Sequence, residues 1–143
     1  MTQLTYLPLQ HSRQWRIASV VMLLLVLIAA LMPAVWFLGD KAGALLWLDN
    51  ADKWMHATTF LVLSLWYAGQ YRPRSYWRIA VGLMAFGLFI EFCQRMVSYR
   101  MADWADVGAN TIGIVIGLVI AMAGAGGWCL RVEAWHAARQ TSM

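Results

Sequence analysis

Two apolar segments and the polar junction between them decide the fold of this chain. The segments are residues 79–97, IAVGLMAFGLFIEFCQRMV, and residues 107–130, VGANTIGIVIGLVIAMAGAGGWCL, joined by SYRMADWAD. Each segment is long enough to cross a bilayer, which takes roughly 20 apolar residues in a helix. Carboxylates are expensive to place beside lipid, so a cluster of them indicates a functional site. The sequence therefore predicts two membrane helices with a polar site where they meet.

Composition extends this prediction to the whole chain. The 143 residues are 62% hydrophobic and 13% charged, whereas soluble domains are about 25% charged. The length fits one domain. We therefore predict an all-α polytopic membrane protein, a single domain over residues 1–143 with four transmembrane helices at about 17–38, 54–71, 79–97 and 107–130.

The distribution of lysine and arginine among the loops predicts the orientation of the chain in the membrane, because short cytoplasmic loops carry an excess of these residues. Seven of the eleven lie before the first segment, between the second and third, or after the fourth, and four lie on the other side. Both termini are therefore expected in the cytoplasm. The formal net charge of +4 does not indicate nucleic-acid binding, because the basic residues are dispersed around the apolar segments.

A polar stripe runs along the predicted fourth helix. Five residues separated by 3, 4, 3 and 4 positions share one face of this helix. They are Asp103, Asp106, Asn110, Gly113 and Gly117. Helix capping would explain one of the two acids, but not both acids together with the amide. The glycine pair lets helices approach closely, either within the chain or between copies in a homo-oligomer, and both alternatives stay open.

The third helix carries a carboxylate inside its apolar span. Glu91 lies six residues before the end of that span, and Gln94 follows it by three positions on the same face. An acid at the centre of a membrane helix costs about 2.5–3.5 kcal/mol, and less away from the centre. Glu91 therefore needs a partner on a neighbouring helix, and the candidates are Lys53, His56 and Arg100.

Three predicted helices thus converge on one polar cluster near the outer face. The cluster contains Lys53, His56, Glu91, Gln94, Arg100, Asp103, Asp106 and Asn110. Two interpretations stay open: a structural ion-pair lock that fixes helix packing, and a ligand-binding or catalytic pocket. One histidine, one glutamate and two aspartates could bind a metal ion, but no spacing matches a ligand motif such as His-Glu-x-x-His. We therefore predict no metal site and no cofactor.

The order and spacing of these residues resemble the VanZ-like family of small bacterial membrane proteins. The similarity covers about residues 17 to 122 and rests on three motifs: Asp-Lys-x-x-His at 52–56, Glu-x-x-Gln at 91–94, and Arg-x-x-Asp-x-x-Asp-x-x-x-Asn-x-x-Gly-x-x-x-Gly at 100–117. The family is associated with glycopeptide resistance, teicoplanin in particular. The resemblance therefore implies a cell-envelope role in the bacterial cytoplasmic (inner) membrane.

The predicted function combines the cluster with that resemblance. The pocket would engage the polar head group of a membrane lipid or of a lipid-linked cell-wall precursor, with Lys53 or Arg100 meeting an anionic group. Two other functions stay open. One is a membrane-embedded acid/base enzyme on a lipid-linked substrate, with Glu91 and His56 transferring protons. The other is a small proton-coupled carrier with Glu91 as the relay.

Overall fold

The computed structural model describes residues 5–32, 48–96 and 104–141. Helices make up most of this part of the chain, and an isolated β-bridge pairs Tyr6 with Tyr71. The elements are α1 (Ser12–Leu31), α3 (Leu48–Ala68), the 3-10 helix η3 (Pro73–Ser75), α4 (Tyr76–Arg95), α5 (Trp104–Ile120), the π-helical turn η4 (Ala121–Ala125) and α6 (Trp128–Thr141). The predicted all-α class is confirmed.

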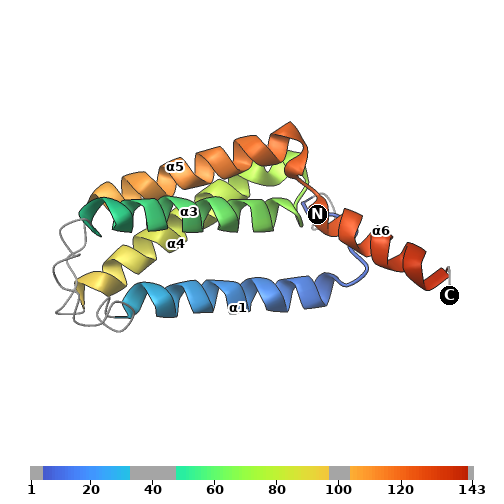
Figure 1. The fold of residues 1–143 in the computed structure, drawn as a ribbon, viewed down its shortest axis with the longest axis horizontal. Coiled ribbons are helices and arrows are strands. Elements are labelled where there is room, and N and C mark those ends of the chain that lie inside the picture. The colour runs from blue at the N-terminus through green and yellow to red at the C-terminus, as the bar shows by residue number, and fades with distance from the viewer. Residues whose placement is uncertain (1–4, 33–47, 97–103, 142–143) are drawn as a thin grey trace.

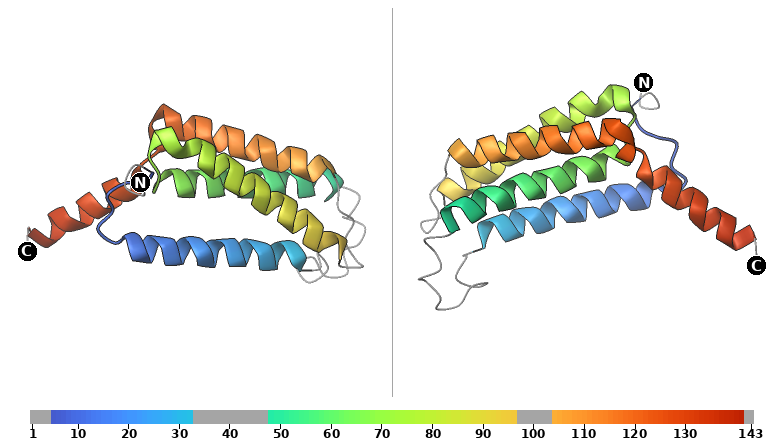
Figure 2. Two further views of the ribbon diagram at one scale, coloured as in Figure 1. Left: turned by 180° about the vertical axis from the view of Figure 1, so that it is seen from behind. Right: turned by 45° about the horizontal axis from the view of Figure 1, so that its top comes forward.

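The helices α1, α3, α4 and α5 lie lengthwise in one bundle, and α6 leaves it at one end (Figure 1, Figure 2). The most extensive contact joins α3 and α5, which lie side by side. Among the described helices, three segments are long and apolar enough to cross a membrane: Ser12–Leu31, Pro73–Arg95 and Trp104–Ala125. These are the features of a multi-pass membrane protein, as predicted.

The structure corrects the fourth predicted helix. We expected one helix over about 107–130, but α5 begins at Trp104 and the helical backbone is interrupted at Gly124, whose φ is 127°. Gly127 follows with a φ of 68°. Both angles lie in the region that favours glycine, because other residues carry a Cβ that clashes there. The chain therefore turns at this point, and residues 128–130 belong to α6.

The other predicted segments shift by a few residues. The first, predicted at about 17–38, is α1, and its residues 33–38 lie outside the described part of the chain. The second, predicted at about 54–71, is α3, and the third, predicted at about 79–97, is α4. All of these helices begin before their predicted start. The reason is that hydropathy marks the apolar part of a helix and misses its polar first turn.

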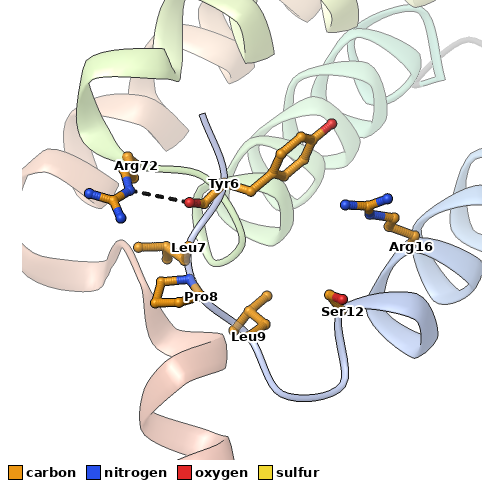
Figure 3. A pocket seen from close by; sticks show the side chains of 7 residues that line it. All are labelled: Tyr6, Leu7, Pro8, Leu9, Ser12, Arg16 and Arg72. Carbon is orange, nitrogen blue, oxygen red and sulfur yellow. Dashed lines mark hydrogen bonds between the residues drawn. The ribbon is translucent and has the colours of Figure 1, made fainter. Parts of the chain in front are cut away.

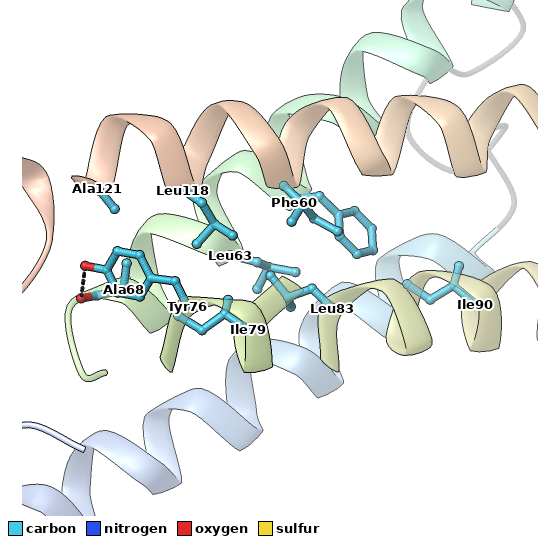
Figure 4. Close-up of a cluster of buried hydrophobic side chains, with 10 residues drawn as sticks. Phe60, Leu63, Ala68, Tyr76, Ile79, Leu83, Ile90, Leu118 and Ala121 are labelled. Atoms are coloured by element: carbon cyan, nitrogen blue, oxygen red, sulfur yellow. Dashed lines mark hydrogen bonds between the residues drawn. The ribbon is translucent and has the colours of Figure 1, made fainter. Parts of the chain in front are cut away.

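Apolar side chains from α3, α4 and α5 form the core of the bundle (Figure 4). Phe60 and Leu63 of α3 are 1% exposed, and Leu83 of α4 is 4% exposed. The outward faces are apolar as well, since Leu25 of α1 and Ile112 of α5 are 61% and 57% exposed. A bundle that is apolar on both sides is expected where lipid is the solvent.

The glycine pair of α5 lets that helix approach α3 closely. A Cβ added at Gly113 would overlap the carbonyl group of Ala57. A Cβ added at Gly117 would lie 2.7 Å from Ser64 Cβ and 2.8 Å from the Leu61 carbonyl oxygen. The pair therefore serves packing within the chain. Association of copies through the fourth predicted helix stays a prediction.

One end of the bundle gathers three segments, and most of the arginines lie in them or on the helices that adjoin them. The Leu7 amide donates to the Gln70 carbonyl at 2.9 Å, and the Gly127 amide donates to the Ala68 carbonyl at 2.9 Å. The N-terminal segment, the α3–α4 turn and the α5–α6 turn therefore meet. These are the regions predicted to be cytoplasmic, and the side of the membrane on which they lie stays a prediction.

Candidate functional site

Three helices bring one histidine and two carboxylates together at the end of the bundle opposite those turns. His56 of α3, Glu91 of α4 and Asp106 of α5 each place a nitrogen or oxygen atom within 4.8 Å of the other two. Their side chains are buried, with relative exposures of 9%, 5% and 5%. We call these three residues the triad.

Helix periodicity explains why the triad residues are buried. His56 lies one turn before Phe60, on the face of α3 that packs in the core. Glu91 follows Ile90 on the buried face of α4. Asp106 is buried on the same face of α5 as Asn110, Gly113 and Gly117, whereas Asp103, the first predicted residue of this stripe, lies outside the described residues. Each side chain therefore occupies a core-facing position of its helix.

The His56 ring is held between two side chains of α5. Its Nδ1 lies 3.0 Å from Oδ1 of Asn110, and its Nε2 lies 3.8 Å from Oδ2 of Asp106. An amide oxygen only accepts hydrogen bonds, so Nδ1 carries a hydrogen and donates it. In the neutral ring, Nε2 is then an unprotonated nitrogen that faces a carboxylate. A proton or another cation between these two atoms would make the contact favourable.

Asn110 also presents a second polar group at the site. Its side chain is 1% exposed, and its Nδ2 has no hydrogen-bond acceptor among the described residues. This nitrogen lies beside Gly87 of α4, where an added Cβ would come within 3.0 Å of it. A buried N–H group in this position can donate a hydrogen bond to a water molecule or to a ligand.

Gln94 was predicted in the cluster, but its amide contacts α1. Its Nε2 donates to the Ala30 carbonyl at 3.0 Å, and its side chain is 2% exposed. Ala30 lies in the last turn of α1, where carbonyl groups lack an intrahelical donor. Gln94 therefore ties the end of α1 to α4.

The remaining predicted members are placed only in part. Lys53 is half-buried on α3, one turn before His56. Arg100 and Asp103 lie outside the described residues. The predicted site residues that the structure brings together are His56, Glu91, Asp106 and Asn110.

Comparison with known proteins identifies the family of the chain. A family model described as VanZ/LLP1 matches residues 2–125. The chain belongs to the VanZ/LLP1 family. The predicted resemblance is thus confirmed, and the matched range includes the whole triad. No curated protein and no solved structure matches the chain significantly.

In this VanZ/LLP1 protein two small cavities border the triad. One of about 110 Å³ is lined by Glu91 together with Arg95 and Trp104. The other, of about 120 Å³, is lined by His56 and by Ala30 of α1. Arg95 holds its guanidinium carbon 5.5 Å from the centre of the Trp104 ring, within cation–π range. The triad therefore borders two cavities, and the one lined by Glu91 is also lined by the cationic side chain of Arg95.

A larger hollow of about 400 Å³ lies at the other end of the bundle (Figure 3). Two arginines line it, and both contact Tyr6. The Arg16 guanidinium carbon is 5.1 Å from the centre of the tyrosine ring, and Arg72 Nε donates to the Tyr6 carbonyl at 3.2 Å. These contacts hold the N-terminal segment against the bundle. We therefore interpret this hollow as structural.

Sequence reasoning missed a buried carboxylate at that end. Glu133 of α6 accepts hydrogen bonds from the Gln10 amide at 2.8 Å, the His11 amide at 2.9 Å and Trp15 Nε1 at 2.9 Å. Burial alone would raise the pKa of the Glu133 carboxyl, but these hydrogen bonds outweigh burial and lower that pKa below its ordinary value. Glu133 thereby stabilises the N-terminus of α1 from a distant helix.

A second missed contact joins α1 to α3. Ser19 is buried, and its Oγ accepts hydrogen bonds from Gln70 Nε2 and Trp66 Nε1, each at 2.9 Å. Its own hydroxyl donates to the Trp15 carbonyl at 2.8 Å. No spacing in the sequence indicates this contact, because its partners come from α1, from α3 and from the turn after α3.

Proposed function

We propose that this protein binds the polar head group of a membrane lipid or a lipid-linked cell-wall precursor in the inner membrane. The observation that carries the proposal is the joint burial of His56, Glu91 and Asp106 at one end of the bundle. Ionisable residues inside a membrane bundle commonly mark substrate or ion pathways. A lock between helices needs only one pair, whereas here three helices each contribute an ionisable group.

The proposal includes a fourth membrane crossing by α3. This helix has 21 residues and spans roughly 31 Å with its polar first turns, so its apolar remainder covers roughly 22 Å of a hydrocarbon core about 30 Å thick. Its charged residues, Asp49, Asp52 and Lys53, all lie in the first two turns. With α3 included, the chain would cross four times, both termini would be cytoplasmic and the triad would lie at the outer end.

The groups around the triad suit a head group with an anionic part. Glu91 and Asp106 accept hydrogen bonds from hydroxyl or amide groups, and Arg95 can bind a phosphate in the cavity that it shares with Glu91. This cavity of about 110 Å³ is smaller than typical ligand sites of about 300–1,000 Å³. Only part of a head group fits there, so the hydrocarbon chain would stay in the lipid.

Cells with and without the protein provide the test. We expect the protein to reduce teicoplanin susceptibility and to change the pattern of labelled envelope lipids. Glu91→Gln should abolish both effects while the variant protein accumulates normally. Thr111→Val, a change on α5 outside the triad, should retain both effects. If removing the protein changes neither susceptibility nor lipid pattern, the proposal is wrong.

The orientation of His56 favours a second function, an acid/base enzyme on a lipid-linked substrate. With Nδ1 bonded to Asn110, Nε2 is left as a base beside the Asp106 carboxylate, an arrangement that suits proton transfer. Purified protein would then convert a labelled lipid-linked substrate, and His56→Gln would abolish turnover but retain binding. Substrate binding without any turnover by the wild-type protein would exclude this function.

A further inference from the structure

We propose that the triad binds one divalent transition-metal ion and that Zn²⁺ fits it best. The ligands would be His56 Nε2 and one carboxylate oxygen each from Glu91 and Asp106. The inference rests on the proposed function, because the ion would lie in the same head-group site. It departs from the sequence prediction of no metal ion. The ligands come from three separate helices, so no local spacing reveals them.

The distances accommodate an ion at the centre of the triad. The candidate ligand atoms lie within 4.8 Å of one another, and the histidine and aspartate atoms are 3.8 Å apart. Ligands at about 2.0–2.2 Å from Zn²⁺ are roughly 3.3 Å apart in a tetrahedral site. The atoms would therefore approach one another by at most about 1.5 Å on binding. Rotation of the side chains can provide this movement.

The Asn110 contact prepares His56 for metal binding. A metal-bound histidine usually donates its other ring N–H to a carboxylate, a carbonyl or water, which fixes the tautomer and the ring orientation. Nδ1 of His56 donates to Asn110 Oδ1 at 3.0 Å and leaves the Nε2 lone pair directed toward Asp106. A metal ion between the Nε2 lone pair and the Asp106 carboxylate would be attracted by both groups.

Charge balance favours a dication in this position. Two carboxylates and a neutral imidazole carry a charge of −2 when the acids are ionised. The three side chains are at most 9% exposed, and at such depth the weak solvent screening strengthens their attraction for a cation. The charge of a divalent ion matches that of this ligand set, which favours a dication over a monovalent ion.

The ligand types select among divalent ions. An imidazole suits Zn²⁺, Fe²⁺ and similar ions, whereas Mg²⁺ and Ca²⁺ prefer sites made of oxygen ligands alone. Three protein ligands with a free fourth position are typical of a catalytic or substrate-binding zinc site. The cavities lined by Glu91 and His56 provide space for that fourth ligand. A phosphate or hydroxyl oxygen of a head group could occupy it.

Metal binding to the full-length protein in detergent tests the inference. After treatment with a chelator, the wild-type protein should take up one equivalent of Zn²⁺ by elemental analysis. It should also develop visible d–d absorption when loaded with Co²⁺. His56→Gln, Glu91→Gln and Asp106→Asn should each weaken Zn²⁺ binding by more than about 100-fold, and Asn110→Ala by about 10–100-fold. His136→Gln, which removes an exposed histidine of α6, should leave binding unchanged.

Two results would overturn the inference. One is the absence of stoichiometric Zn²⁺ uptake by the wild-type protein, a result that does not depend on whether any variant folds. The other is an equal loss of binding in His136→Gln and His56→Gln. No lipid is present in this experiment, so a failure of metal binding would leave the head-group proposal standing. Metal binding without any effect on envelope lipids or teicoplanin susceptibility would remove the head-group proposal and leave the metal site.

Discussion

The imidazole of His56 and the side-chain amide of Asn110 join α3 to α5, with Nδ1 3.0 Å from Oδ1. Asn110 lies one turn before Gly113, where α5 contacts the Ala57 carbonyl next to His56. The hydrogen bond therefore depends on the close approach that glycine permits. Helix packing and the chemistry of the site are coupled at this point.

Loss of the amide should destabilise the bundle measurably. Asn110→Ala leaves the buried Nδ1–H of His56 without an acceptor, which should lower the free energy of unfolding by about 1–3 kcal/mol. Thr111→Val is the matched control, because the Thr111 hydroxyl donates to the Val107 carbonyl of its own helix at 2.7 Å and makes only a weak contact with Met84 Sδ of α4 at 3.7 Å. Thermal unfolding in detergent measures both variants. Equal midpoints for the two would disprove the role assigned to Asn110.

The glycine pair should tolerate no larger residue. Gly113→Ala places a methyl group against the Ala57 carbonyl, so α3 and α5 must separate, with an expected loss of about 1–3 kcal/mol or more. Gly108→Ala is the control on the same helix, since nothing lies within 4 Å of its added Cβ. It should be neutral or slightly stabilising, because alanine favours the helix. Similar melting temperatures for the two variants would contradict this packing.

Glu133 should make the protein less stable as the pH falls into the acid range. Its folded-state pKa is lowered, so its contribution is present above the unfolded pKa of about 4.3 and is lost as pH falls through the folded value. Glu133→Gln should unfold more readily at neutral pH and lose less further stability on acidification. Melting temperatures from neutral pH down to about pH 3 measure the difference. Parallel curves for the two proteins would rule out this role of the carboxylate.

The proposed four crossings predict where reporter fusions are active. A fluorescent protein fused at either terminus should fluoresce in intact cells, and a periplasm-dependent phosphatase at the same place should stay inactive. A fusion after Gly43 should give the opposite pattern, because this position follows the first crossing. An active C-terminal phosphatase together with a fluorescent N-terminal fusion would place the termini on opposite sides and show that α3 does not cross the membrane.

The polar cluster could be predicted because it follows local periodicity. The spacing of Asp106 and Asn110 places both on one helix face, and the structure shows both buried there. Glu91 was identified from its cost inside an apolar span, and it is 5% exposed. His56 was selected by its expected depth. The first two arguments need one helix each, and the third needs only the expected depth of each residue in the membrane, so the sequence alone identified these residues.

Other features could not be predicted because they depend on contacts between distant segments. The hydrogen bonds from Gln10 and His11 to Glu133 join the two ends of the chain. The hydrogen bond from Gln94 of α4 to the Ala30 carbonyl of α1 depends on how these two helices pack, which only the bundle reveals. The glycines of residues 124–127 indicate the break after α5. Glycine is also common in membrane helices, so the prediction followed hydropathy and continued the helix through these residues.

Direct binding of a lipid-linked cell-wall precursor by purified protein in nanodiscs tests the head-group proposal most directly. Wild-type protein should bind the precursor saturably. Folded Glu91→Gln should bind about 10- to 100-fold more weakly, since a hydrogen bond to a charged group contributes about 1.5–3 kcal/mol. Thr111→Val should bind like the wild type. Equal affinities for wild type and folded Glu91→Gln would contradict the assignment of the buried triad as the binding site.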